Sequence, residues 1–429
     1  MLYNIFVDFS QNKGEIMQKN IKLFPIYKLF SYDVLFYYAI SILFLTITKG
    51  FSLSQVALLS SIYATSAIIC QIPASIIADK IGYKNSMIIG NLLCMSWALL
   101  YILVPTFNIL MFAEFLCALG FALKGVAESP FIYAVMKKEG QLSSYSKVEG
   151  RGSSYYFVAE AIASVAAGYL FYINAYLPMI FGALCFLIAT VMSFYMKPIK
   201  TPQKEILTPK EHFAEMFSGF KFIFKSKRLH ALLIFAAVFN GVVALSSLYI
   251  KSFLTGINVS STLFGYIFAL ASVASAIGAA IQERIEKKYK NKTLSAVSII
   301  FITSFVVIGI FSLIVESYMP LLIIGTIVFL VQTFIKGAYR IIIKEYVNRY
   351  TTSSIRSKLM SIYYLVESFG SAVLTFIASK TIDLVPIGIS YCVFGFGLFI
   401  VLILILNYMS SRVGLDPNKY TKSDRMDLQ

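Results

Sequence analysis

The chain has few charged residues, few histidines and few cysteines. Of its 429 residues only 14% are charged, two are histidine, one is tryptophan and five are cysteine, whereas 58% are hydrophobic. Ordinary soluble domains are about 45–50% apolar and about 25% charged. A soluble fold could not bury this much apolar surface. The composition therefore excludes a cytosolic enzyme, a disordered chain and a secreted disulfide scaffold, and is typical of a protein embedded in a lipid bilayer.

The residue types that hold metals and nucleotides are nearly missing. Neither His212 nor His230 has a metal-ligand partner at helical spacing, and no CxxC pair occurs. There is no Gly-rich phosphate loop, so we do not expect an ATP-driven pump. We expect no metal, no cofactor and no enzymatic activity. All five cysteines fall in apolar runs and are expected to be small buried hydrophobes: Cys70, Cys94, Cys117, Cys185 and Cys392.

Long apolar runs make up most of the sequence. A membrane-spanning helix needs about 20 mostly apolar residues, and twelve such runs can be marked. The sequence therefore predicts an all-α membrane protein with twelve transmembrane helices. The expected spans are 29–48, 55–78, 87–105, 109–135, 154–172, 175–196, 230–250, 262–281, 294–315, 320–343, 359–379 and 385–408.

The basic residues are distributed very unevenly between the two sides of these spans. The net charge is +16, and 31 of the 37 Lys and Arg fall in gaps on one side, against three on the other. This is the positive-inside bias, and it places both termini in the cytoplasm of a cell-membrane protein. Because the charge is explained in this way, we do not expect nucleic acid as a partner.

A long central gap divides the spans into two groups of six. Short sequence matches recur in the same order in both groups at an offset near 206 residues, which predicts a parallel repeat of two six-helix bundles. Within the gap, aromatic and basic residues at helical spacing predict an amphipathic helix over 208–228. The expected organisation is a cytoplasmic N-terminal segment (1–28), an N-terminal bundle (29–196), a cytoplasmic linker (197–229), a C-terminal bundle (230–408) and a cytoplasmic tail (409–429).

One short motif carries a family resemblance. The segment between the second and third runs reads SIIADKIGYK. It resembles the hallmark G-x-x-x-D-x-x-G-R-[RK] of the major facilitator superfamily, with Asp79, Gly82 and Lys84 at matching positions. Ser75 and Tyr83 replace the usual Gly and Arg. Together with the twelve spans and the central gap, this resemblance implies the major facilitator fold, and it gives Asp79, Gly82 and Lys84 a role in closing the cytoplasmic gate.

Two further stretches resemble an efflux-like branch of bacterial facilitators. GFALKGVAE, which ends at Glu128, is similar to the fourth span of that branch, and IRSKLMS, which contains Arg356, is similar to a segment before its eleventh span. The resemblance implies a secondary transporter that exports drugs or metabolites, and it adds Arg356 to the gating motif. The Pro-containing antiporter pattern of the fifth span is absent here.

Several charged residues lie inside the expected spans, where a charge costs about 2.5–3.5 kcal/mol on insertion scales. Asp33, Glu128 and Glu160 lie on the first, fourth and fifth runs at similar expected depths. Spans at these positions line the central cavity in the family. These acids, with Lys124 nearby, could therefore share an exchangeable proton. The alternative is a structural ion pair between Lys124 and Glu128, which are four residues apart.

The C-terminal half carries a different set of charges at the corresponding positions. Lys336, Arg340 and Glu367 are the repeat counterparts of Lys124, Glu128 and Glu160, so one acid is replaced by a base. We count these residues as candidates for substrate binding or proton coupling. Glu114 lies nearer the outer face of the membrane, and we expect it to be structural.

The sequence as a whole predicts a transporter that works by alternating access, driven by the proton gradient. The first hypothesis is proton-coupled export of an amphipathic drug or metabolite. The alternatives are proton-linked uptake of a small nutrient, and a non-transporting sensor or lipid translocator on the same fold. The expected partners are a small-molecule substrate, protons and the lipid bilayer, and we expect a monomer.

Overall fold

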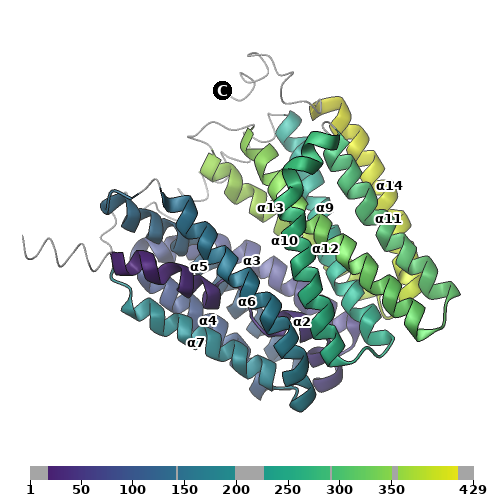
Figure 1. The fold of residues 1–429 in the computed structure, drawn as a ribbon, viewed down its shortest axis with the longest axis horizontal. Coiled ribbons are helices and arrows are strands. Elements are labelled where there is room, and N and C mark those ends of the chain that lie inside the picture. Colours follow the sequence, from purple (N-terminus) through teal and green to yellow (C-terminus); the bar gives the residue numbers. More distant parts are fainter. Residues whose placement is uncertain (1–17, 142–143, 199–226, 290–291, 350–355, 414–429) are drawn as a thin grey trace, which may run out of the picture. The chain divides into compact units, whose positions relative to one another are not determined.

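The computed structural model describes residues 18–141, 144–198, 227–289, 292–349 and 356–413 (Figure 1). Every regular element in these ranges is helical, as the sequence predicts. A helix over 18–31 comes first. The others are α2 (Tyr37–Leu43), the π-helix η1 (Phe44–Thr48), α3 (Leu53–Ile81), α4 (Tyr83–Leu103), α5 (Phe107–Lys138), α6 (Tyr145–Ile173), α7 (Leu177–Tyr195), α9 (Lys227–Gly256), α10 (Ser261–Tyr289), α11 (Thr293–Ile314), α12 (Tyr318–Arg349), α13 (Arg356–Thr381) and α14 (Ile387–Val413).

Eleven of the described helices are long and apolar enough to cross a membrane, and they match the second to twelfth expected spans. The first span differs from its expected form. Instead of one helix over 29–48 there are two, over 18–31 and 37–48, separated by a turn. Phe36 in this turn has a φ of +66°, a left-handed conformation that is uncommon for a bulky residue. The first span is therefore a broken helix.

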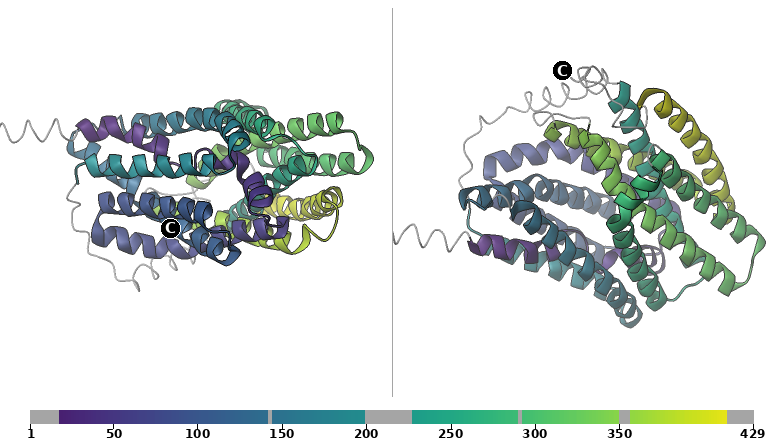
Figure 2. Two further views of the ribbon diagram at one scale, coloured as in Figure 1. Left: turned by 90° about the horizontal axis from the view of Figure 1, so that it is seen from below. Right: turned by 45° about the horizontal axis from the view of Figure 1, so that its top comes forward.

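The described helices group into two compact units. Unit 1 comprises residues 1–40 and 69–211, and unit 2 comprises residues 41–68 and 212–429, so α3 contributes to both. Within unit 1, α4 packs against α5 and α7, and within unit 2 the main pairs are α9 with α13, α10 with α12, and α11 with α14 (Figures 1 and 2). The division into two bundles of six spans stays a prediction. The expected linker helix over 208–228 lies outside the described residues, except for its last two positions.

Small residues allow α4 and α5 to approach each other closely. Gly90 on α4 faces Gly120 on α5: a methyl group on Gly120 would lie 2.7 Å from the carbonyl oxygen of Gly90 and 2.8 Å from the sulfur of Cys94. Close contact between glycines is a common way for membrane helices to associate. This crossing fixes the face of α5 that carries the acidic residues described below.

The N-terminus of α3 is capped by a reciprocal pair of hydrogen bonds. The backbone N–H of Gln55 donates to the Ser52 hydroxyl at 3.2 Å, and the backbone N–H of Ser52 donates to the Gln55 side chain at 3.0 Å. This S-x-x-Q arrangement is a capping box. A third N–H, that of Ser54, donates at 3.1 Å to the carboxylate of Asp383, which follows α13 in unit 2.

This contact predicts a pH-dependent contribution of Asp383 to stability. Partial burial disfavours its charged form, but the hydrogen bonds from Ser54 and Ser52 outweigh that effect and lower the pKa of Asp383. A lowered pKa stabilises the fold above the ordinary Asp value, and the contribution disappears as the pH falls through the lowered one. We expect Asp383→Asn to cost up to about 1 kcal/mol at neutral pH.

Melting curves at neutral and acidic pH test this expectation. The melting temperatures of Asp383→Asn and the unmodified protein should differ at neutral pH and converge in acid. An equal difference at both pH values would show that the charge of Asp383 does not stabilise α3.

Candidate functional site

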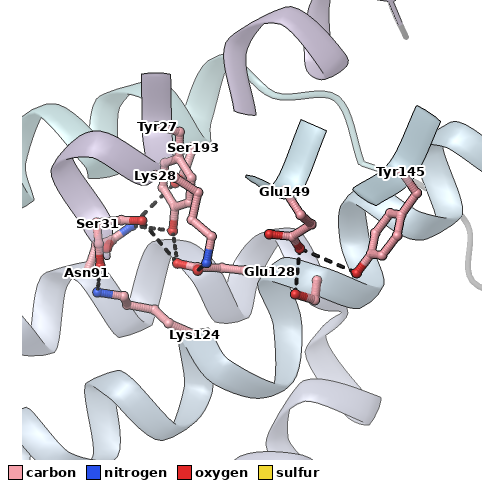
Figure 3. Close-up of polar contacts among 10 residues, drawn as sticks. Tyr27, Lys28, Ser31, Asn91, Lys124, Glu128, Tyr145, Glu149 and Ser193 are labelled. Atoms are coloured by element: carbon pink, nitrogen blue, oxygen red, sulfur yellow. Dashed lines mark hydrogen bonds and ion pairs between the residues drawn. The ribbon is translucent and has the colours of Figure 1, made fainter. Parts of the chain in front are cut away.

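A buried polar network joins the N-terminal half of the broken first span, residues 18–31, to α5 (Figure 3). Its centre is the carboxylate of Glu128, which is 4% exposed. The Lys28 ammonium forms an ion pair with Oε2 of Glu128 at 2.6 Å. The hydroxyls of Tyr27 and Ser31 donate to Oε1 at 2.7 and 3.1 Å. Tyr27, Lys28 and Ser31 lie on one face of the first helix, and all three therefore bind the same carboxylate.

The network continues through α4 to α7. The side-chain amide of Asn91 donates to the hydroxyl of Tyr27 at 3.2 Å and to that of Ser193 at 3.4 Å. Asn91 is fully buried, and its Oδ1 has no hydrogen-bond partner within the described part of the chain. An unsatisfied buried acceptor costs free energy. The Asn91 Oδ1 atom is therefore a position where the network lacks a hydrogen-bond donor.

Lys124 does not form the expected ion pair with Glu128. Its ammonium donates instead to the backbone carbonyl of Ser31, the last residue before the break in the first span. It also lies 4.1 Å from the ring centroid of Phe121 and 5.0 Å from that of Phe186, both within cation–π range. The alternative of a direct Lys124–Glu128 ion pair therefore does not hold, because the first helix brings a closer cation, Lys28, to Glu128.

Lys28 is held in place by close packing. It was expected to be a cytoplasmic charge of the N-terminal segment, but the residue is only 9% exposed. A methyl group on Gly152 of α6 would lie 3.0 Å from the Cβ of Lys28, so the two backbones lie close together. The Lys28 ammonium also lies 5.2 Å from the ring of Tyr32. Burial and close packing make this an ion pair of the protein interior.

The other two acids of the expected proton site lie apart from this pair. Asp33 is exposed in the break and accepts the N–H of Val34 at 2.8 Å. Glu160 is half-buried on α6. Both interact electrostatically with Tyr156, whose ring stacks on Tyr32 at 4.6 Å. The structure thus brings Asp33 and Glu160 together around Tyr156, and Glu128 together with Lys28.

Of the corresponding residues in the C-terminal half, Glu367 is part of a second polar cluster within unit 2. Glu367 on α13 accepts from the amide of Asn240 on α9 at 2.6 Å and from the hydroxyl of Tyr363. Lys336 and Arg340 lie one turn apart on α12, half-buried and exposed respectively. The two clusters differ in chemistry: Glu128 is bound by a lysine as well as by two hydroxyls, whereas Glu367, the counterpart of Glu160, accepts from an amide and a phenol.

The gating motif has local structural roles in unit 1. Gly82, with a φ of +81°, makes the turn between α3 and α4. The ammonium of Lys84 donates to the carbonyl of Phe194 at 2.9 Å and so caps the C-terminal end of α7. Asp79 lies in the last turn of α3. Arg356 begins α13, and its side chain lies outside the described part of the structure.

Four residues of this network could not be recognised from the sequence: Tyr27, Lys28, Ser31 and Asn91. Those on the first helix were missed because it begins before the apolar run and its polar residues read as a cytoplasmic segment. Phe24, Tyr27, Lys28 and Ser31 share one helical face, which is the signal that could have revealed them.

Eleven apolar helices, a broken first span and a buried ion pair between two spans are typical of a multi-pass membrane transporter. The comparisons with known proteins identify the family. The chain belongs to the Major Facilitator Superfamily, whose family model matches residues 29–340.

Individual relatives are distant. The uncharacterized MFS-type transporter YxaM of Bacillus subtilis (strain 168) is 24% identical over 330 residues, which cover 76% of this chain and 79% of YxaM. Among solved structures, the nucleoside transporter NupG superposes with a TM-score of 0.73 at 12% identity, covering 94% of this chain and 99% of NupG. The POT family transporter PepTSo gives 0.73 at 13% identity, covering 93% and 99%. At these identities the structural likeness establishes the fold alone.

Proposed function

We propose that this protein is a proton-coupled secondary transporter of the cell membrane that exports an amphipathic small molecule. The observation that carries the coupling is the buried Lys28–Glu128 pair, which joins the broken first span to α5. A buried ion pair is costly to form and strongly destabilising to break on one side only. A proton that neutralises Glu128 would leave Lys28 without its counterion. It would thereby weaken the contacts that hold residues 18–31, the N-terminal half of the first span, against α5.

The break in the first span supports this coupling. Discontinuous helices in transporters supply free backbone groups and places of movement near the binding site. Lys124 binds the last carbonyl before the break, and Lys28 and Ser31 bind Glu128. A change of charge at Glu128 would therefore act directly on the segment that ends at the break.

The direction of export rests on the resemblance of the fourth and eleventh spans to the efflux-like branch. The cytoplasmic position of both termini rests on the distribution of Lys and Arg. Transport of a small molecule is consistent with the relatives, of which NupG carries nucleosides by its name.

Transport in proteoliposomes tests the proposal. A fluorescent amphipathic cation is used as the probe, and a pH gradient is imposed in either direction. We expect the unmodified protein to concentrate the dye against its gradient on the side from which protons enter. The double variant Lys28→Met with Glu128→Gln removes both buried charges and should lose this accumulation while still exchanging dye between equal concentrations. If the double variant accumulates the dye fully, Glu128 is not part of the coupling site. If the pH gradient moves none of a panel of compounds through the unmodified protein, proton coupling is refuted.

A further inference from the structure

A second buried carboxyl on α5, Glu114, is held very differently from Glu128. It is 9% exposed. The hydroxyl of Tyr101 and the indole N–H of Trp97, both on α4, donate to its Oε1, the latter at 3.4 Å. Among the residues that the structure describes, no lysine or arginine contacts it. Glu128 is thus neutralised by a cation, whereas Glu114 has only neutral donors.

The surroundings of Glu114 are aromatic. The ring of Tyr37 on α2 lies 5.2 Å from that of Trp97 and 5.9 Å from that of Tyr101, both edge to face. Tyr37 and Cys117 are the other titratable side chains that interact electrostatically with Glu114. Burying an ionised carboxylate among such groups is costly, whereas the neutral acid is tolerated. Because both donors reach Oε1, the second oxygen, Oε2, remains to carry a proton.

Glu114 is also placed to act on the first span. It lies 14 residues before Glu128 on α5, or about 21 Å along the helix axis at 1.5 Å per residue. Glu128 contacts the N-terminal half of the broken span (18–31) through Tyr27, Lys28 and Ser31. Glu114 reaches the C-terminal half (37–48) through Trp97, which donates to it and packs edge to face on the ring of Tyr37, the first residue of α2 after the break. Each half of the first span thus has its own carboxyl on α5.

We propose that Glu114 is a second proton-binding carboxyl. A change in its protonation would shift Tyr101 and Trp97, and through Tyr37 it would act on the C-terminal half of the first span, residues 37–48. Protonation at Oε2 leaves a neutral acid, and deprotonation leaves a carboxylate that draws the Tyr101 and Trp97 donors towards Oε1. The consequence for transport rests on the proposed function; the binding of the proton does not.

The chain supplies its own probe for this site, because Trp97 is its single tryptophan. We expect the tryptophan fluorescence of the purified full-length protein to change through one pH transition. Glu114→Gln should abolish the transition, since the amide cannot titrate. Glu283→Gln, which changes an exposed acid on α10, should retain it. Tyr101→Phe removes one donor to the charged form and should move the midpoint to higher pH, which keeps the test decisive if Glu114→Gln does not fold.

Two results would overturn the proposal: the same transition in Glu114→Gln, or no transition in the unmodified protein. The transport assay is then repeated with Glu114→Gln, which should lose gradient-driven accumulation of the dye and keep exchange. If the unmodified protein shows the fluorescence transition but no gradient-driven transport, the proposed function fails while the proton site stands. If Glu114→Gln accumulates dye fully, the site binds a proton that does not drive transport, which contradicts its role in coupling.

Discussion

Glu128→Gln is expected to lower the free energy of unfolding by about 3–5 kcal/mol, because it leaves a buried ammonium without its counterion. Lys28 is 9% exposed, and Glu128 is its carboxylate partner at 2.6 Å. The glutamine keeps the shape and one acceptor for Tyr27 or Ser31, so the loss reflects charge rather than volume. Thermal melting of the purified protein in detergent measures the effect.

Two matched variants show whether burial is responsible. Lys28→Met combined with Glu128→Gln removes both charges and should recover most of the lost stability. Glu283→Gln breaks the Lys287–Glu283 pair on α10, which has the same 2.6 Å separation but side chains 74% and 69% exposed. That change should leave the free energy of unfolding nearly unchanged, because water already screens the two charges. Equal losses for Glu128→Gln and Glu283→Gln would contradict the assignment of Lys28–Glu128 as an interior ion pair.

Gly120→Ala is expected to destabilise the protein by about 1–3 kcal/mol through steric conflict. The added methyl would lie 2.7 Å from the Gly90 carbonyl oxygen and 3.2 Å from the Cys94 backbone nitrogen, and neither atom belongs to a side chain that can rotate away. The two helices must separate, which also disturbs Lys124, because its side chain packs on Gly90 in the same crossing. Melting temperature and dye accumulation should both fall.

Gly125→Ala is the control on the same helix. A methyl group at Gly125 meets no atom within 4 Å. Alanine is the better helix former by about 1 kcal/mol. Gly125→Ala should therefore be neutral or stabilising. A loss of stability similar to that of Gly120→Ala would show that the α4–α5 crossing does not determine the effect.

The candidate site could be predicted only in part. Four of its charged residues can be recognised in the sequence, because a charge within an apolar run costs free energy unless it has a partner or a polar cavity: Glu128, Lys124, Asp33 and Glu160. Their partners do not stand out in the same way. Lys28 lies just before an apolar run and reads as a cytoplasmic charge, and its burial depends on the packing of Gly152 from another helix.

The two acids of α5 show the same limit. In the sequence, Glu114 and Glu128 are both single carboxyl groups in one apolar run, and Glu128 with Lys124 four residues before it looks like a local pair. The fold pairs Glu128 with Lys28, about 100 residues away, and surrounds Glu114 with the rings of α4 and α2. Which acid has a cation depends on contacts between helices, and helical periodicity carries no information about them.

Local composition was enough to predict a helical membrane protein and the positions of eleven of its spans, and a short motif was enough to predict its family. The spans are predictable because about 20 apolar residues satisfy their backbone hydrogen bonds within one helix, and this requires nothing from the rest of the chain. Three features depend on the folded chain instead: the break of the first span at residues 32–36, the pairing of Lys28 with Glu128 and the neutral donors of Glu114. These features arise because a buried polar group takes the partner that packing brings within hydrogen-bond distance, wherever that partner lies in the sequence.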